Sequence, residues 1–477
     1  FWHNDTTIII RDENPERKGM GAKQRIYTAG VLYYTVLKLR TDFQKGRQED
    51  VMERNDPRYQ AYVEILKEEL IPAMGCTEPI ALAYAAAKAR EVLGVLPDSV
   101  QLQVSGSIIK NVKSVIVPNT GHLKGMEAAV AAGIIAGSAE KELEVISEVS
   151  EEKKSAIRDY LQTVPITIEH TEQGHVFDIV VTERCGQDYA RVRIADYHTN
   201  ICRIEKNGTV LYEVPLLDET VQEDARADRS LLNMQDIWDF AETADLRDVA
   251  DLLERQIRYN NAIAEEGLLG DYGANIGRVL LTTYGNDVSN RAKAKAAAGS
   301  DARMNGCELP VIINSGSGNQ GITCSVPLIE YAKELHSGKE KLYRALIISN
   351  LVAIHEKTGI GTLSAYCGAV SAGAGAGAGI VYLCGDGYQA AIHTVVNALA
   401  IVSGIVCDGA KASCAAKIAS SVDAALLGYN MYKCNQEFKG GDGIVMKDIE
   451  TTIKGIGRLG KDGMRQTNEE IIRLMMS

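Results

Sequence analysis

The chain has 477 residues, enough for two or three domains that each bury a core. Its formal net charge of -12 argues against a nucleic-acid partner, because a nucleic-acid surface needs clustered Lys and Arg. Ten cysteines without a C-x-x-C pair, and no positively charged and apolar leader, do not resemble a secreted disulfide framework. We therefore expect a protein of the reducing cytoplasm.

The first 51 residues mix charged and aromatic residues without a steady period. Met52 then begins a segment that resembles a natural start followed by an amphipathic helix. Residues 1–51 are therefore expected to be an N-terminal extension, either foreign to the natural protein or a peripheral arm.

From Met52 onward the sequence predicts three regions. Residues 52–96 form a helical start, in which the turn GCTEP precedes a helix framed by Pro79 and Gly94. Residues 97–215 contain the alternating, β-branched runs of strands beside two helical segments, and predict an inserted small α/β domain. Residues 216–477 are helical in pattern. The predicted fold class is α+β, a mainly helical domain with an inserted small α/β domain.

Two uncharged stretches, 367–385 and 387–407, have the length of membrane spans. The first is mostly Gly and Ala, which are too weakly apolar to insert readily, so we interpret both as buried helices without membrane contact. Gly inside a helix costs about 1 kcal/mol relative to Ala. The run SAGAGAGAG (371–379) therefore indicates either a close approach to the backbone or tight packing between helices.

The segment PVIINSGSGNQGITC (310–324) allows several interpretations. Gly316, Gly318 and Gly321 fit the G-x-G-x-x-G of a dinucleotide-binding turn. That interpretation is weak, because no acidic residue ends the next strand-like run and Pro327 falls in the required helix.

The same letters resemble the Asn-bearing turn of pyridoxal-phosphate lyases, for which Lys293 or Lys295 would supply the Schiff base. Such a fold alternates strands with helices, whereas the chain after residue 325 shows helix after helix. A third interpretation is an anion-binding loop, since Gly and Ser leave backbone N–H groups unshielded and the following helix adds its positive end. A substrate carboxylate would suit this loop, and a plain tight turn is the alternative without a function.

Cys367, Cys407 and Cys414 lie among Gly and Ala residues. In one straight helix the last two would be roughly 10 Å apart along the axis. Asp408 and Gly409 break a helix, however, so the thiolates can come together. Three thiolates without a local fourth suit an iron-sulfur cluster with an open iron, or zinc with a water.

Four segments together resemble the L-cysteine desulfidase family, which is related to the iron-sulfur-dependent L-serine dehydratases. They are ILKEELIPAMGCTEPIALAYAAAKAREVLG, NSGSGNQGI, SAYCGAVSAGAGAGAGI and VCDGAKASCAAKIASS. The resemblance runs from about residue 52 to the end of the sequence and implies a mainly helical catalytic domain interrupted by a small α/β domain.

The resemblance also implies a [4Fe-4S] cluster held by Cys367, Cys407 and Cys414. It places Cys76 in the active site, as a displaceable fourth ligand or as a base. It implies that the amino acid binds to the Gly-Ser-Asn loop, which consists of Asn314, Ser315, Gly316, Ser317, Gly318, Asn319 and Gln320.

An open iron is a Lewis acid that accepts a leaving sulfur. The expected reaction is a non-redox β-elimination of L-cysteine to hydrogen sulfide, pyruvate and ammonia. Cys76 is the first choice as base, because a helix starting near Pro79 favours the thiolate. Glu78, which is also a candidate helix cap, and Lys110 are the alternatives. His122 is a candidate substrate-binding residue from the inserted domain.

Other functions remain open at this point. An L-serine or L-threonine dehydratase with the same cluster would differ only in the leaving group. A pyridoxal-phosphate lyase and a non-catalytic thiol or iron sensor are the further alternatives. The expected partner is a small amino acid, and the sequence allows a homo-oligomer.

Overall fold

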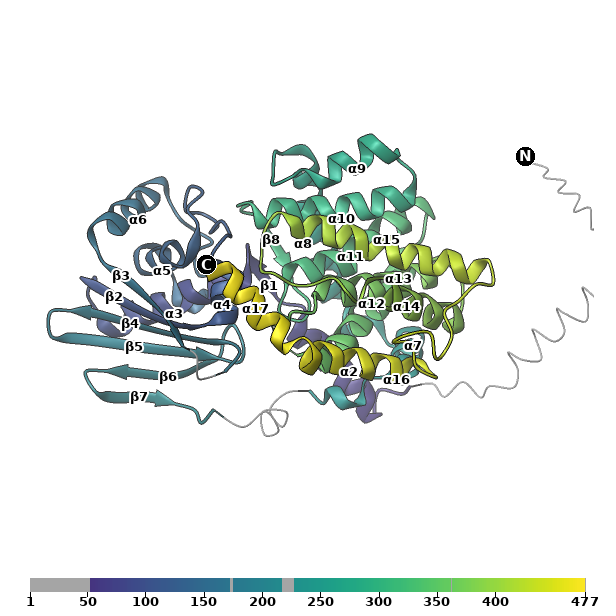
Figure 1. Ribbon diagram of the computed structural model, residues 1–477, viewed down its shortest axis with the longest axis horizontal. Coiled ribbons are helices and arrows are strands. Elements are labelled where there is room, and N and C mark those ends of the chain that lie inside the picture. The colour runs from purple at the N-terminus through teal and green to yellow at the C-terminus, as the bar shows by residue number, and fades with distance from the viewer. Residues whose placement is uncertain (1–51, 172–174, 217–226, 362, 477) are drawn as a thin grey trace, which may run out of the picture. The chain divides into compact units, whose positions relative to one another are not determined.

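The computed structural model describes residues 52–171, 175–216, 227–361 and 363–476 (Figure 1). The N-terminal extension expected at 1–51 lies outside these described residues. Within them the fold is α+β and mainly helical, which confirms the predicted fold class.

One layer of the fold is a six-stranded sheet with the strand order β3-β2-β4-β5-β6-β7 (Figure 1). The pair β2 and β3 is parallel, and the other neighbours are antiparallel. The strands are β2 (Ser99–Ser105), β3 (Ile166–Thr171), β4 (Asp178–Cys185), β5 (Asp188–Ala195), β6 (Ile201–Lys206) and β7 (Thr209–Glu213). Val100, Leu102 and Val104 alternate into the core along β2, as the period of two predicts.

Four α-helices among the described residues pack in this layer. Helix α3 (Thr77–Leu93) packs on β4 and β5, α5 (Gly125–Ala136) packs on α3, and α6 (Glu151–Thr163) packs on α5. The short helix α4 (Gly106–Val112) packs on β2 and α3. A Cβ atom at Gly133 would lie 2.1 Å from the Ala83 carbonyl oxygen, so only glycine permits the close approach of α5 to α3. The inserted α/β domain was expected to begin at residue 97. Helix α3 ends before that residue but packs on the sheet of this domain.

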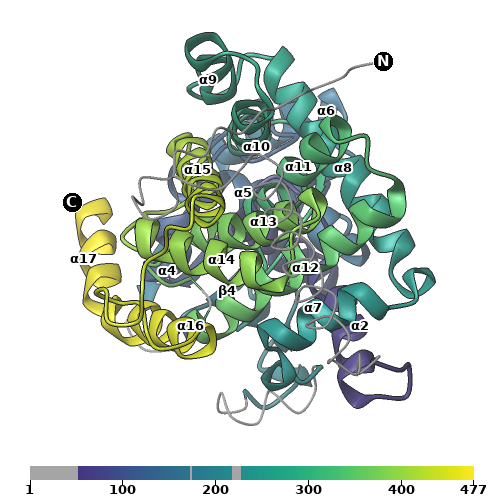
Figure 2. The same ribbon diagram turned by 90° about the vertical axis from the view of Figure 1, so that its right-hand side faces the viewer.

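The helical part surrounds α13 (Gly368–Cys384) (Figure 2). Its packing partners are α11 (Gly318–Glu334), α12 (Lys339–Ile360), α14 (Tyr388–Val402) and α15 (Ser413–Lys433). A Cβ atom at Gly375 would lie 2.4 Å from the Ser349 carbonyl oxygen. The glycines of α13 therefore allow tight helix packing, which was one of the two interpretations of the run 371–379.

The remaining helices complete this part. They are α2 (Pro57–Glu69), α7 (Met234–Thr243), α8 (Ala250–Leu269), α9 (Ile276–Tyr284), α10 (Val288–Met304), α16 (Ile449–Arg458) and α17 (Arg465–Met476). The two uncharged stretches became α13 and α14, whose side chains are largely buried. No helix among the described residues is long and apolar enough to span a bilayer.

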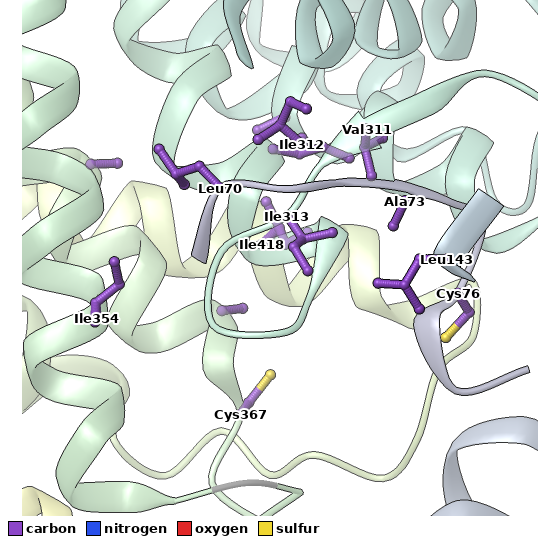
Figure 3. Close-up of a cluster of buried hydrophobic side chains, with 14 of the residues drawn as sticks. Leu70, Ala73, Cys76, Leu143, Val311, Ile312, Ile313, Ile354, Cys367 and Ile418 are labelled. Carbon is purple, nitrogen blue, oxygen red and sulfur yellow. The ribbon is translucent and has the colours of Figure 1, made fainter. Parts of the chain in front are cut away.

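A short antiparallel ribbon joins two segments that are far apart in the sequence. Strand β1 (Pro72–Met74) pairs with β8 (Pro310–Ile312), and Ala73 lies opposite Val311 (Figure 3). The GCTEP turn follows β1, and the Gly-Ser-Asn loop follows β8. This pairing therefore brings the two predicted active-site turns together.

Candidate active site

A cavity of about 120 Å³ lies where four helices begin. Its lining includes residues from the first turn or the N-terminal flank of α3, α11, α13 and α15. Each helix N-terminus carries partial positive charge, so their convergence favours anionic contents. A second, more open hollow has a volume of about 420 Å³ and is lined by Glu127 and residues 161–166. Glu127 is the one ionisable side chain in that lining. The smaller cavity is therefore the candidate active site.

Three of the predicted ligands line this cavity. Cys367 is the N-cap of α13, Cys414 is in the first turn of α15, and Cys407 lies in the loop between α14 and α15. The Cys407 N–H donates to the Ala365 carbonyl across 2.6 Å, which fixes this loop beside Cys367. The helix break expected near Gly409 is present, and Gly409 has a φ of +93°.

The three thiols act on one another through charge. Burial, followed by the charges of the neighbouring Cys407 and Cys414, raises the pKa of Cys367 to about 12. Two cations oppose this charge. Lys417 lowers the pKa of Cys367, and Lys357 lines the cavity with its own pKa lowered by burial to about 8. Bound metal would favour the thiolates, as it does at other cysteine sites.

The donor set at the cavity consists of thiols. No three His, Cys, Asp or Glu side chains in the described part of the chain are already placed to hold one metal ion. The ligands of a polynuclear cluster bind different metal atoms and need not converge on one point. Three thiols on one cavity, beside helix N-termini and lysines, are a suitable donor set for such a cluster.

Cys76 reaches the same cavity from the start of α3. Figure 3 shows the sulfur atoms of Cys76 and Cys367 directed from opposite sides toward the space between them. Burial and the charge of Glu78 raise the pKa of the Cys76 thiol, which Arg303 only partly opposes. These effects oppose the helix dipole on which the thiolate was expected, and they favour the thiol while no metal is bound.

Glu78 is the acceptor at the centre of a buried network. Its Oε2 accepts hydrogen bonds from Cys76 Sγ and Thr77 Oγ1, both across 3.1 Å, and its Oε1 accepts one from Asn111 Nδ2 across 2.9 Å. His198 Nε2 lies 4.0 Å from Oε1, too far for a hydrogen bond but close enough to act through charge. Burial raises the pKa of Glu78, but His198 and Cys76 lower it more, so the carboxylate is retained.

The predicted loop contributes most of its residues to the cavity. Those in the lining are Ser315, Gly316, Ser317, Asn319 and Gln320. Asn314 is fully buried outside it, and its Nδ2 donates to Asn350 Oδ1 across 3.0 Å. Gly318 also lies outside the lining, beneath Arg303.

Several other predicted candidates are away from the cavity. His122 is exposed and does not line it. Lys110 is buried outside the lining, where its Nζ donates to Asn468 Oδ1 across 2.6 Å. The two proposed Schiff-base lysines bind carboxylates elsewhere, Lys293 that of Asp423 and Lys295 that of Glu265.

Sequence reasoning missed His198, Arg303, Asn111 and Lys357, which all line the cavity. His198 comes from the loop between β5 and β6, and Arg303 from the last turn of α10. The one available signal was an Arg near the end of the Ala-rich run 292–302. Several cavity-lining atoms are buried without a hydrogen-bond partner: Asn111 Oδ1, His198 Nε2, Arg303 Nε, Asn319 Oδ1 and Gln320 Oε1.

The sequence matches the serine dehydratase alpha chain family over residues 140–473. It is 61% identical over 426 residues to a UPF0597 protein of Desulfitobacterium hafniense, covering 89% of this chain and 99% of the relative. A UPF0597 protein of Lachnoclostridium phytofermentans is 52% identical, and the match covers 88% of this chain and 100% of the relative. A UPF0597 protein of Treponema denticola is 46% identical, and the match covers 89% of this chain and 100% of the relative.

The chain therefore belongs to the serine dehydratase alpha chain family, a family of lyase-type enzymes. This membership confirms the relation to serine dehydratases that the four segments predict.

Proposed function

We propose that this protein is an L-cysteine desulfidase, which converts L-cysteine and water to hydrogen sulfide, pyruvate and ammonia. One observation carries the proposal. Cys367, Cys407 and Cys414 come from separate segments and line the same cavity as the buried pair Cys76 and Glu78.

The three cysteines would hold a [4Fe-4S] cluster, and Lys357 and Lys417 would offset the charge of their thiolates. When bound, an iron without a protein thiolate supplies a Lewis acid for the departing sulfur. Cys76, Glu78 and Cys367 are buried in the lining, and the lower dielectric around buried groups strengthens their electrostatic interactions.

Cys76 and Glu78 would move the proton. As the Cα–H bond of the substrate breaks, Cys76 Sγ takes that proton and its own proton passes to the Glu78 carboxylate, 3.1 Å away. The electron pair of the C–H bond forms the new C=C bond, and the C–S bond breaks to release hydrosulfide. The resulting aminoacrylate tautomerises to an imine, which water hydrolyses to pyruvate and ammonia. No net oxidation or reduction occurs.

The proposal is tested with protein purified without oxygen. We expect a brown protein that contains iron and inorganic sulfide, and that releases sulfide and pyruvate from L-cysteine in equal amounts. Turnover that persists after complete removal of iron would exclude the proposed cofactor. A yellow chromophore that survives air and is lost in Lys295→Ala would instead indicate the pyridoxal-phosphate alternative.

The family match favours a second candidate, an L-serine or L-threonine dehydratase that uses the same residues. Hydroxide would then leave in place of hydrosulfide. The same assay separates the two, because the dehydratase forms pyruvate from serine at a higher kcat/KM than from cysteine. A sensor would bind the cluster and release neither product.

A further inference from the structure

Arg303 is a buried arginine whose guanidinium has no anionic partner among the described residues. It is 2% exposed in the last turn of α10, and within the described residues its side chain has no hydrogen bond or ion pair. By contrast, Arg229, on the short turn before α7, pairs with Glu68 and Glu69. The C-terminal carbonyls of α10 offset only part of the Arg303 charge. Burying an unpaired guanidinium costs free energy. We therefore expect a bound ligand to supply the missing anionic partner.

The guanidinium lies against the N-terminus of α11. A Cβ atom at Gly318 would be 2.3 Å from Arg303 Nε, so glycine is what allows this contact. Helix α11 is 17 residues long, and its N-cap Ser317 makes no side-chain capping bond. The first N–H groups of a helix have no acceptor within the helix. Arg303, Asn319 and Gln320 all line the cavity, so the guanidinium lies beside the first turn of α11.

Arg303 and Cys76 line the same cavity. The guanidinium is close enough to act on this thiol through charge, although burial and Glu78 have larger opposing effects on the pKa of Cys76.

Acceptor atoms complement Arg303 in the same lining. Asn111 Oδ1, Asn319 Oδ1 and Gln320 Oε1 are buried without a partner. The orientation of Asn111 is fixed, because its Nδ2 donates to Glu78. One free cationic donor beside free carbonyl oxygens matches the carboxylate and ammonium groups of an α-amino acid.

We propose that Arg303 and the N-terminus of α11 bind the α-carboxylate of the substrate, which makes Arg303 a specificity-determining residue. The site would then accept an amino acid with a free carboxylate and reject the corresponding amine. This inference rests on the proposed function for the identity of the reaction, but the carboxylate requirement is measured by binding.

The test uses the cluster-loaded protein and three probes. L-Cysteine is the substrate, 3-mercaptopropionate keeps the carboxylate but lacks the amine, and cysteamine keeps the amine but lacks the carboxylate. We expect 3-mercaptopropionate to raise the melting temperature and inhibit, and cysteamine to do neither at the same concentration. In Arg303→Gln the stabilisation by 3-mercaptopropionate should vanish, and KM for L-cysteine should rise roughly 10- to 100-fold.

The ligand-free protein gives a second readout. Because Arg303→Gln removes an unpaired buried charge, the ligand-free variant should melt no lower than the wild type. Arg303→Lys should restore part of the binding. Arg255→Gln is the matched control, since Arg255 Nε also lacks a partner but Arg255 does not line the cavity.

The outcomes separate the two proposals. If Arg303→Gln binds 3-mercaptopropionate as the wild type does, the inference is wrong whether or not sulfide is released. If ligand-free Arg303→Gln melts lower and Arg303→Lys restores no binding, the role is structural and the inference is also wrong. If carboxylate binding depends on Arg303 but no sulfide forms from L-cysteine, the inference stands and the proposed function fails.

Discussion

The thiol of Cys76 donates a hydrogen bond to the carboxylate of Glu78 across 3.1 Å, and both side chains are buried. The pair is asymmetric, because burial and Glu78 raise the pKa of the thiol, whereas the pKa of Glu78 lies below its usual value. These shifts keep the proton on Cys76 and the negative charge on Glu78. In the proposed reaction Cys76 can take a proton from the substrate only as its own proton moves to Glu78. Cys76 and Glu78 should act as a unit.

Replacement of either member should stop the proton transfer. We expect Cys76→Ser and Glu78→Gln each to lower kcat by about 10²- to 10⁴-fold, with the double variant little worse than either single one. Steady-state kinetics with L-cysteine measures this. Cys434→Ser, at an exposed cysteine, is the control and should keep full activity. Multiplicative effects in the double variant would show that the two residues act independently.

Iron content should separate the roles of the cysteines. Cys367→Ser, Cys407→Ser and Cys414→Ser should each lose most of the iron, because two thiolates do not hold the cluster stably. Cys76→Ser should keep its iron if Cys76 serves as a base. Elemental analysis of oxygen-free preparations measures this, and a loss of iron in Cys76→Ser comparable to that in the other three would make Cys76 a required ligand.

The packing of α13 should tolerate no added methyl group at its closest contact. Gly375→Ala would place a Cβ atom 2.4 Å from the Ser349 carbonyl oxygen, so we expect a loss of about 1–3 kcal/mol in the free energy of unfolding. Gly404→Ala meets no atom within 4 Å and is the control. Chemical denaturation compares the two, and equal stability would contradict the close approach.

Stability should depend on pH through Glu330, which bridges Lys295 and Lys333. Burial raises the pKa of Glu330, but the two lysines lower it more. A carboxyl group whose pKa is lowered by folding stabilises the folded state when the pH is above its ordinary pKa. This stabilisation is lost as the pH falls through the lowered pKa.

We therefore expect Glu330→Gln to lose roughly 1–3 kcal/mol of stability at pH 7, and the difference from the wild type to shrink below about pH 4. Thermal unfolding across this range measures it. Glu334→Gln on the same helix removes a half-exposed partner of Arg291 and should cost less than about 1 kcal/mol. A difference for Glu330→Gln that stays constant with pH would exclude this linkage.

Local patterns predicted the elements better than the site. The alternating runs SVQLQVSG, VPITIEH, VFDIVVTE, YARVRIADYH and GTVLYEV predicted β2, β3, β4, β5 and β7. Asp408 and Gly409 predicted the break between the helices that flank Cys407. The patterns did not predict β6, in which charged residues interrupt the apolar alternation. The cavity depends instead on contacts between distant segments, such as Arg303 against Gly318 and His198 near Glu78. No local period encodes such contacts.

The order in which the cavity is assembled follows from the positions of its walls along the chain. The lining runs from Cys76 to Ile418, and the last predicted ligand is Cys414. A nascent chain that has reached only residue 400 contains Cys76 and Cys367 but neither Cys407 nor Cys414. Assembly of the proposed cluster on the complete set of thiols must therefore wait until translation has passed Cys414, in the first turn of α15.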